Sequence, residues 1–354
     1  MTQDYQKDWD LSHWQHLYGE VKAQADFKVN PEDFVVTEQL SFEPCGEGEH
    51  LFLLIEKRQL NTQQVCEYLA KFFEKRLRDI GYAGLKDKQS VSRQWFSVQM
   101  NVLAQPDLSA LKAEGIQLVK HIRHNKKLKI GALSANHFDI RLGNVSDKAW
   151  LLERLELVKS GVPNYFGEQR FGFKGNNLNW ANRMADGEVI KNKKIKGFAL
   201  SASRSYLFNE VISRRIEQGI FAKAQDGDVY MLAGSNSFFS EAVSEQIETR
   251  LVQRDIQISA PLFGSGELAS SAETADLEQG VTEPFGNWLT MLSDHGLKQE
   301  RRSIGLFPSK MRWQEQGQDV WVSFELPTGC FATSVLRECV EIRESTENNE
   351  DPNK

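Results

Sequence analysis

The sequence predicts a mixed α/β protein of the α+β type that is divided into two domains. Two apolar runs rich in β-branched and aromatic residues, 34–40 and 50–56, lie between turn-forming segments and are expected to be strands. Apolar residues at helical spacing predict a helix over residues 61–80. At 354 residues the chain is long enough for two hydrophobic cores of ordinary size.

The predicted helix has recognisable start and stop signals. Asn61 or Thr62 supplies an N-cap, and Gly81 is expected to end the helix. The segment YAGLKDK follows and leads to a predicted strand over residues 94–100. Residue 87, the aspartate of that segment, therefore lies on a connection between a core helix and a core strand, where a rigid scaffold can position a reactive group.

The composition changes after a second predicted helix, residues 147–159. Residues 164–180 are rich in Gly, Asn and aromatic side chains and are expected to be irregular, and a helix is predicted over residues 203–219. Strand character returns at residues 319–326, and a short helix is expected near residues 335–339.

These changes predict the domain organisation. Residues 1–160 together with 307–343 are expected to form one domain, and residues 161–306 a second domain inserted into it. The last segment, residues 344–354, is acidic, lacks hydrophobic residues and is expected to be disordered.

Composition and motifs exclude several classes of protein. Hydrophobic residues make up 40% of the chain and charged residues 26%, which is typical of a soluble globular protein. No apolar run is long enough to span a bilayer, and the N-terminal segment lacks the pattern of a secretion signal. The four cysteines form no CxxC pair, and no metalloprotease, P-loop or serine-hydrolase motif is present. We therefore expect a reduced, cytoplasmic enzyme.

Positive charge is clustered although the net charge is −6. Residues 120–129, KHIRHNKKLK, and residues 191–196, KNKKIK, are both rich in Lys. Each could be an ordinary solvated face, but two such segments interleaved with aromatic stretches favour a polyanionic partner.

One short stretch, GYAGLKDKQS at residues 81–90, combines glycines with a single carboxylate between two cations. Asp87 lies between Lys86 and Lys88, and nearby cations favour the ionised form of a carboxylate. That setting suits a nucleophile better than a general acid. On spacing alone, a solvated or N-capping aspartate explains the pattern equally well.

The run YAGLKDKQSVSRQWFSV, residues 82–98, resembles the signature of the TruD family of tRNA pseudouridine synthases, in which the aspartate of a GxKD segment is catalytic. Five further blocks resemble family segments in the same order, so the resemblance covers nearly the whole chain: FKVNPEDFVVTE (27–38), ANHFDIRL (135–142), NYFGEQRFG (164–172), SRSYLFN (203–209) and PTGCFATSVLRE (327–338).

The resemblance implies the pseudouridine-synthase catalytic fold, with a mixed, largely antiparallel sheet and an inserted second domain. It also implies the isomerisation of uridine to pseudouridine in tRNA, at position 13, with no metal and no organic cofactor. Asp87 would carry the chemistry on a base flipped out of its stack; its role as nucleophile or as base stays open.

The resemblance assigns further residues to the substrate site. Phe138 is the candidate platform for the base, and Asn136 the candidate hydrogen-bond partner of the uracil or the ribose. Phe34 and Phe331 match family positions that line the site, although core packing is the plainer role for a phenylalanine. Lys28 and Glu32 match a charged family block that could organise the pocket, or could form a surface ion pair of little energetic weight.

Four basic residues are candidates for RNA contacts. Lys126 and Lys127 belong to the first basic segment. Arg170 and Arg204 could bind phosphates through their guanidinium groups, or could instead hold domain structure. The expected partner is tRNA, with no membrane association and no obligate protein partner, and the chain is expected to be a monomer.

Two other functions compete with an RNA-modifying isomerase. A non-catalytic RNA-binding or chaperone protein could keep the same fold, but the intact GLKDK segment disfavours it. A carboxylate-dependent glycosidase would need a second catalytic carboxylate, for which Glu32 is the only candidate nearby.

Overall fold

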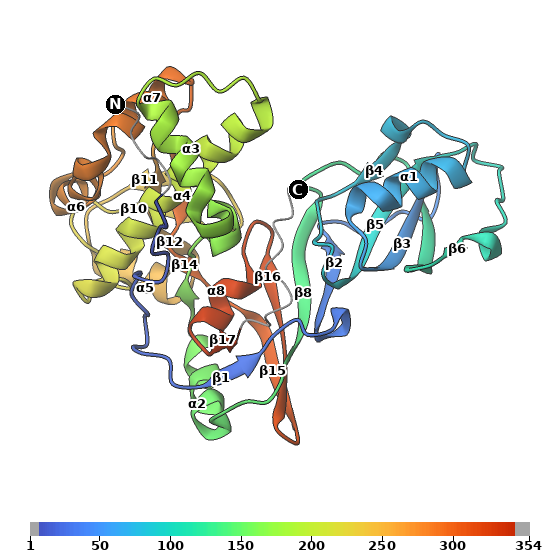
Figure 1. Ribbon diagram of the computed structural model, residues 1–354, viewed down its shortest axis with the longest axis horizontal. Helices are drawn as coiled ribbons and strands as arrows, with labels where there is room; N and C mark the ends of the chain where they lie inside the picture. Colours follow the sequence, from blue (N-terminus) through green and yellow to red (C-terminus); the bar gives the residue numbers. More distant parts are fainter. Residues whose placement is uncertain (1–6, 344–354) are drawn as a thin grey trace.

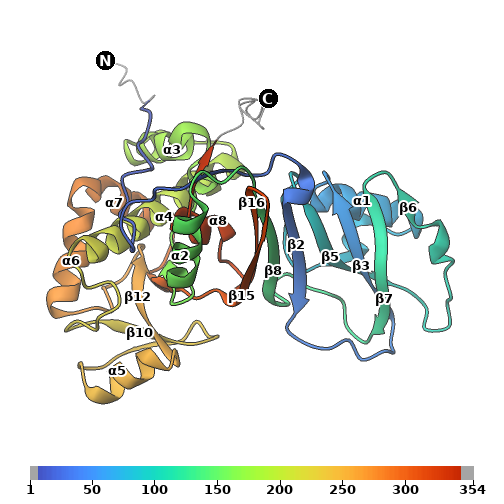
Figure 2. The ribbon, with the colours of Figure 1, turned by 90° about the horizontal axis from the view of Figure 1, so that it is seen from below.

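The computed structural model describes residues 7–343, so the predicted acidic tail at residues 344–354 lies outside the described residues. A nine-stranded sheet forms the centre, in the order β15-β16-β8-β2-β5-β3-β7-β6, with β4 paired to β5. Figure 2 shows its strands side by side. The strands are β2 Phe34–Leu40, β3 His50–Arg58, β4 Ile80–Tyr82, β5 Val91–Gln99, β6 Lys112–Ala113, β7 Ile116–His124, β8 Leu133–Leu142, β15 Ser309–Gln316 and β16 Asp319–Pro327.

All neighbours in this sheet are antiparallel except β2 and β5, which run parallel. The expected mixed, largely antiparallel sheet is therefore confirmed. Strands from both ends of the chain meet in it, because β16 pairs with β8.

Three helices cover one face of the sheet at its two ends. Helix α1 (Thr62–Phe72) packs on β3 and β5, whereas α2 (Lys148–Val158) and α8 (Ala332–Arg337) pack on β8 and β16. The register aligns Val36 of β2 with Phe138 of β8 and Ser92 of β5, so these side chains share that face. The middle of the face, around β2, thus lies between the two groups of helices.

A second lobe holds five helices and a smaller sheet. The small sheet has the strand order β11-β10-β12-β13 and is antiparallel throughout. Figure 1 shows this helical lobe beside the end of the large sheet that holds β15, β16 and β8, and α1 over the strands near the other end. The elements are α3 Asn176–Ala185, α4 Lys193–Glu217, β10 Val229–Leu232, β11 Phe238–Ser240, α5 Glu245–Val252, β12 Ile256–Leu262, α6 Ala272–Thr282, α7 Gly286–Asp294 and β13 Glu300–Ser303.

Two short ladders tie the lobes and the chain ends together. Strand β9 (Val162–Pro163) pairs with β14 (Gly305–Leu306), so the chain leaves for the helical lobe and returns from it at adjacent points. Strand β1 (Gln24–Asp26) pairs in parallel with β17 (Glu341–Arg343). The first ladder supports an insertion over residues 161–306, whose limits stay a prediction.

The helix predicted over residues 61–80 is shorter in the structure. Asn61 caps it as expected, accepting a hydrogen bond from the Gln64 amide, but α1 ends at Phe72, and Glu74 has a left-handed φ of 53°. Gly81 does not end a helix; it lies inside β4. A Cβ at Gly81 would lie 2.5 Å from a backbone carbonyl of the segment that follows β7, so the glycine permits that close approach.

Helix α4 also differs from its prediction, since it begins at Lys193 rather than at residue 203. The side chain of Asn192 caps it by accepting from the amides of Lys194 and Ile195. The second basic segment, residues 191–196, therefore runs into the first turn of the helix.

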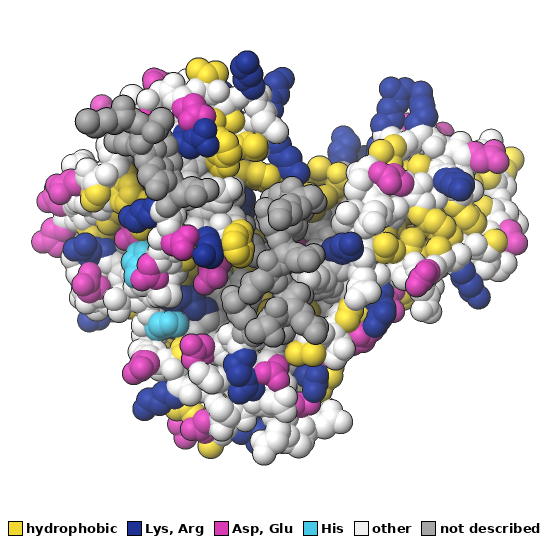
Figure 3. All heavy atoms as spheres, in the orientation of Figure 1, with side chains coloured by type: hydrophobic (Ala, Val, Ile, Leu, Met, Phe, Trp, Pro, Cys, Tyr) yellow, Lys and Arg dark blue, Asp and Glu magenta, His cyan; other side chains and the backbone are white. Residues whose placement is uncertain are grey.

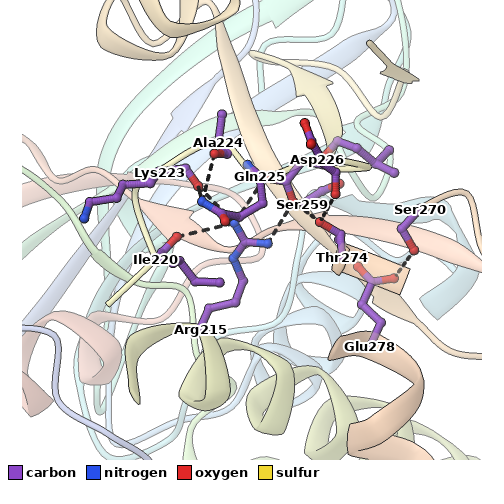
Figure 4. Close-up of polar contacts among 12 residues, drawn as sticks. Arg215, Ile220, Lys223, Ala224, Gln225, Asp226, Ser259, Ser270, Thr274 and Glu278 are labelled. Carbon is purple, nitrogen blue, oxygen red and sulfur yellow. Dashed lines mark hydrogen bonds and ion pairs between the residues drawn. The ribbon is translucent and has the colours of Figure 1, made fainter. Parts of the chain in front are cut away.

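Two buried ion pairs fix the helical lobe internally, and Figure 4 shows Arg215 of the first pair and Glu278 of the second. Arg215 of α4 binds Asp228 through both terminal nitrogens, at 2.8 and 3.1 Å. Arg301 of β13 binds Glu278 of α6 at 2.9 and 3.0 Å, and Ser270 donates to the same carboxylate. All four charged side chains are essentially inaccessible to solvent, so each charge depends on its partner.

We expect Glu278→Ala to lower the free energy of unfolding by about 3–5 kcal/mol, because it leaves the Arg301 guanidinium buried without a counter-charge. Urea denaturation followed by tryptophan fluorescence measures the change. Glu156→Ala is the matched control, since Glu156 pairs with Lys159 on the surface and its side chain is 61% exposed; its cost should stay below about 1 kcal/mol. Equal losses in the two variants would contradict the expected weight of the buried pair.

Candidate functional site

Asp87 lies in the loop between β4 and β5, with 60% of its side chain exposed. Its main chain is held from the buried side. The ammonium of Lys57, a fully buried residue of β3, donates to the carbonyl oxygens of Asp87 at 2.9 Å and of Leu60 at 2.6 Å. The hydroxyl of Ser90 donates to the same Asp87 carbonyl at 3.0 Å. The backbone of Asp87 is thus fixed while its carboxylate faces solvent.

The ionisation of Lys57 is shifted by this setting. Burial lowers the pKa of Lys57 to about 8, against the opposing effect of Asp87, which favours the charged form. At pH 7 Lys57 therefore keeps its proton and donates as an ammonium. A buried cation without these two carbonyl acceptors would be strongly unfavourable.

The preceding part of the loop is anchored by α1 and β5. The side-chain amide of Gln94 donates to the carbonyl of Gly84 at 2.7 Å. The Thr62 hydroxyl donates to Gln94 at 3.1 Å and accepts from the Lys86 amide at 3.0 Å. Thr62 and Gln94 are both buried, so solvent does not compete for these hydrogen bonds.

Of the two lysines that flank Asp87 in sequence, Lys86 has another partner. Its ammonium lies 2.7 Å from the carboxylate of Glu38, which is buried and also accepts from the Trp95 amide. Burial raises the pKa of Glu38, and Lys86 opposes that rise. The cation beside the Asp87 carboxylate is instead Lys28, whose Nζ lies 3.9 Å from Oδ2.

Lys28 connects Asp87 to an aromatic surface. It has a left-handed φ of 54°, and its ammonium lies 4.0 Å from the centroid of Phe34. Burial lowers the pKa of Lys28, and the nearby Asp87 carboxylate opposes this effect. Its charge is therefore stabilised by one carboxylate and by the face of an aromatic ring.

Phe34 begins a row of rings across the central strands. Its ring centroid lies 5.9 Å from that of Phe138, which in turn lies 5.6 Å from Phe324. Asn136 precedes Phe138 by two residues on β8, and its Oδ1 is buried without a hydrogen-bond partner in the described structure. Phe34 and Phe138 are each only 6% exposed, so they form an apolar wall rather than an open platform.

Two other predicted site residues lie in different surroundings. Phe331 packs against the core of the helical lobe, with its ring 6.2 Å from that of Phe166. Glu32 forms an ion pair with Arg58 at 2.5 Å, and both side chains are about half exposed. No ion pair or ring contact among the described residues joins Phe331 or Glu32 to Asp87, so their part in the site stays a prediction.

The two candidate arginines have different partners. Arg170 donates from Nη1 to the Ser201 hydroxyl at 3.1 Å. Arg204 donates from Nη2 to the carbonyls of Leu262 at 2.8 Å and Lys298 at 2.9 Å. Arg204 thus bridges the end of β12 to the segment before β13.

The lysine-rich segments lie on different lobes. Lys126 is exposed, whereas Lys127 donates to the carbonyl of Arg78 at 2.6 Å. The other segment, residues 191–196, runs into the first turn of α4, which contains no acidic residue. The N-terminus of a helix already carries positive partial charge, so added lysines make this end attractive to anions.

Figure 3 shows the molecular surface hollowed between the two lobes, with Lys and Arg side chains on both sides of the hollow. In the same orientation, Figure 1 shows β8 and β16 between the lobes. The arrangement offers a basic, open surface to an elongated polyanion.

The site presents one exposed carboxylate, an adjacent cation and an apolar wall. Glu38, a second carboxylate held near the same loop, is buried and engaged by Lys86. Within residues 7–343, no three His, Cys, Asp or Glu side chains gather as a metal site would require. The geometry therefore suits chemistry that begins with a single ionised carboxylate.

Sequence reasoning missed several residues that build this site. No local pattern marks Lys57, Thr62 or Gln94 as part of a site, because their role depends on contacts between distant parts of the chain. A usable signal was the position of Lys57, which the alternation of β3 places on the buried side of the strand.

Among the described residues no helix is long and apolar enough to cross a membrane.

Comparisons with known proteins agree with this architecture. A solved structure from Methanosarcina mazei, described as a putative tRNA pseudouridine synthase D (TruD), superposes with a TM-score of 0.72 and covers 94% of this chain and 95% of that one. Its sequence is 22% identical, so this likeness shows the fold.

Sequence relatives are nearer. A protein of Pseudoalteromonas atlantica named tRNA pseudouridine synthase D is 46% identical over 339 residues, which cover 94% of this chain and 97% of the relative. One of the same name from Aeromonas hydrophila is 43% identical and covers 95% and 96%. The family model "tRNA pseudouridine synthase D (TruD)" matches residues 16–191 and 188–339. The chain therefore belongs to the TruD family.

Proposed function

We propose that this protein isomerises uridine to pseudouridine in tRNA, at position 13, and that Asp87 is the catalytic carboxylate. The observation that carries the proposal is the arrangement at residue 87 in a chain of the TruD family. Buried donors fix its main chain, and its carboxylate is exposed beside Lys28. The reaction fits a site with one free carboxylate.

The reaction exchanges one bond between base and sugar for another. The N1–C1′ bond breaks, the uracil turns while bound, and a C5–C1′ bond forms; the hydrogen on C5 is released as a proton, and N1 takes up a proton. Asp87 acts ionised and close to C1′, either as a nucleophile or as the base that removes a sugar proton. The reaction has no net redox change, and we expect it to need no metal and no organic cofactor.

Lys28 and Lys57 have separate roles in this proposal. Lys28 places a positive charge 3.9 Å from the Asp87 carboxylate, at the point where the substrate would meet it. Lys57 holds the Asp87 main chain in place, so that the carboxylate is already positioned when the sugar binds. Lys57 is accordingly a positioning residue and does not touch the substrate.

The wall formed by Phe34 and Phe138 would receive the flipped uracil. Extrusion from the RNA stack costs a few kcal/mol, and contact with aromatic side chains offsets part of that cost. The unpartnered Oδ1 of Asn136 can accept a hydrogen bond from the uracil N3–H or from a ribose hydroxyl. Phe331, in the turn between β16 and α8, would approach the substrate from the junction of the large sheet with the helical lobe.

Contacts to the tRNA backbone would come from both lobes. The lysine-rich segments at residues 120–129 and 191–196 supply sequence-independent attraction, which weakens as salt is added. We expect the enzyme to act as a monomer in the cytoplasm. A glycosidase is disfavoured because Glu32 and Glu38 are both held in ion pairs.

We expect Asp87→Asn to abolish tritium release from tRNA transcripts that carry [5-³H]uridine, because the amide cannot act as a nucleophile or as a base. Binding of the same tRNA should be retained, since in this proposal the Asp87 side chain makes no contact with the RNA backbone. Release by the variant at a rate near that of the wild type would contradict the catalytic assignment. Transcripts with cytidine at position 13 provide the control for the target site.

We expect Lys57→Met to slow tritium release by one or two orders of magnitude at saturating tRNA, because a carboxylate displaced by about 1 Å loses roughly that much rate. Affinity for tRNA should change little. Lys112→Met, an exposed change on β6 outside both lysine-rich segments, is the matched control. Equal rates for the Lys57 variant and the wild type would contradict the positioning role.

The wild type and Lys57→Met should also differ in how their free energies of unfolding depend on pH. The pKa of Lys57 is about 8 in the folded protein and near 10.5 when unfolded, so between these values the unfolded chain binds more protons. Relative to Lys57→Met, the wild type should therefore gain stability as pH rises from 8 to 10.5, by at most about 1.4 kcal/mol per pH unit. A constant difference across this window would contradict the shifted pKa.

A further inference from the structure

Two guanidinium groups lie beside one aromatic ring at the junction of the lobes. The Cζ of Arg302 lies 4.4 Å from the centroid of Phe166, and the Cζ of Arg170 lies 5.4 Å from it. Arg302 belongs to β13, and Arg170 to the short 3-10 helix Glu168–Phe171. Nothing in the sequence patterns marked Arg302.

Neither arginine has a carboxylate partner in the described part of the chain. Arg302 donates from Nη2 to the Asn164 side chain at 2.8 Å and to the Gly329 carbonyl at 3.0 Å. Arg170 donates to the hydroxyl of Ser201. The Nε atoms of Arg170 and Arg302 are both buried and unpartnered among the described residues, which leaves unused donors on both groups.

This pair carries positive charge that the protein does not neutralise. Burial lowers the pKa of both groups, and Arg170 further lowers the pKa of Arg302. Two like charges in a partly desolvated setting are unfavourable unless an anion joins them. A phosphate matches the planar guanidinium fork and would accept from several of its nitrogens.

The pair is also next to the predicted substrate region. Gly329, which accepts from Arg302, lies in the turn that leads to Phe331, and Phe331 packs on Phe166. A cavity of about 350 Å³ is lined by Phe166, Ser201 and Arg204, so the ring and Ser201, the hydrogen-bond partner of Arg170, border open space, although neither Arg170 nor Arg302 lines that cavity.

We propose that Arg302 and Arg170 together bind one backbone phosphate of the substrate RNA, close to the target nucleotide. The inference rests on the proposed function and adds a specific contact to it. Arg204, whose Nη2 is taken up by the carbonyls of Leu262 and Lys298, is assigned to holding the strands rather than to this phosphate.

The test measures the binding of a tRNA transcript as a function of salt for the wild type, Arg302→Gln, Arg170→Gln and the double variant. Each single change should lower the slope of log K against log salt by about one and weaken binding about tenfold or more at low salt. The double variant should lose no more slope than either single variant, because one phosphate is shared. Arg302→Lys keeps the charge and should keep the slope.

The control is Arg214→Gln, because Arg214 lies on α4 of the same lobe and is 56% exposed in a surface pair with Glu217. Its slope should equal that of the wild type. Melting temperatures identify variants that fail to fold. If Arg302→Gln fails to fold, the slope measured for Arg170→Gln alone tests the proposal. An unchanged slope for a folded Arg302→Gln or Arg170→Gln would overturn the proposal.

The source of the phosphate is tested with transcripts that carry a neutral methylphosphonate at single linkages around the target. One linkage should weaken binding by the wild type but not by Arg302→Gln; sensitivity that is the same for both proteins at every linkage would overturn the assignment. A rise in the melting temperature of the wild type with inorganic phosphate, combined with no linkage at which methylphosphonate weakens binding, would identify a small-anion site. That result would also overturn the assignment to an RNA phosphate. Tritium release by the wild type separates the two proposals: no release defeats the proposed function, whereas release with an unchanged slope defeats only the phosphate contact.

Discussion

The buried ammonium of Lys57 and its hydrogen bond to the Asp87 carbonyl are the constraint on which the candidate site depends. An exposed carboxylate that must react cannot be held by many bonds to its own oxygens, since those bonds would occupy the reactive atoms. The protein instead fixes the main chain behind it, with donors from β3 and β5 and with the first residue of α1. The cost of burying a cation is offset by two carbonyl acceptors, that of Asp87 in the loop and that of Leu60 just before α1.

The rest of the architecture follows from the placement of this loop. The large sheet carries helices at both ends of one face, and its middle strands leave room for the segment around Lys28 and for the wall of Phe34 and Phe138. The helical lobe meets that sheet at the turn before α8, where Phe331 packs on Phe166. A substrate in the hollow would therefore contact both lobes, and the ion pairs inside the helical lobe keep its surface fixed.

Much of the fold could be predicted from local patterns. Strand β2 and the N-cap at Asn61 match their predictions because alternation and capping are local signals. The end of α1 could not be predicted, because the apolar spacing continues past Phe72, whereas the chain turns at Glu74 in a left-handed conformation and then enters β4, which pairs with β5. The early start of α4 depends on Asn192, whose capping role was hidden within a run read as a charged surface.

The candidate site was predictable only in part. Asp87 and Lys28 come from blocks about sixty residues apart, and the family resemblance singled out both residues. Lys57 and Arg302 could not be found in this way, because their roles arise from contacts with Asp87 and Phe166 across long sequence separations. A lysine in a strand and an arginine among other basic residues have no distinctive local pattern. Such positioning residues become visible only when burial and partners are known.

The central claim is that position, and not charge alone, makes Asp87 effective. Asp87→Glu keeps the carboxylate and moves it outward by one methylene on an otherwise unchanged main chain. Single-turnover tritium release at saturating tRNA tests this most directly. The account predicts a rate at least about 100-fold below that of the wild type, with tRNA affinity unchanged. A rate within a fewfold of the wild type would contradict the claim. It would show that the fixed main chain of Asp87 does not determine the reactivity of the carboxylate.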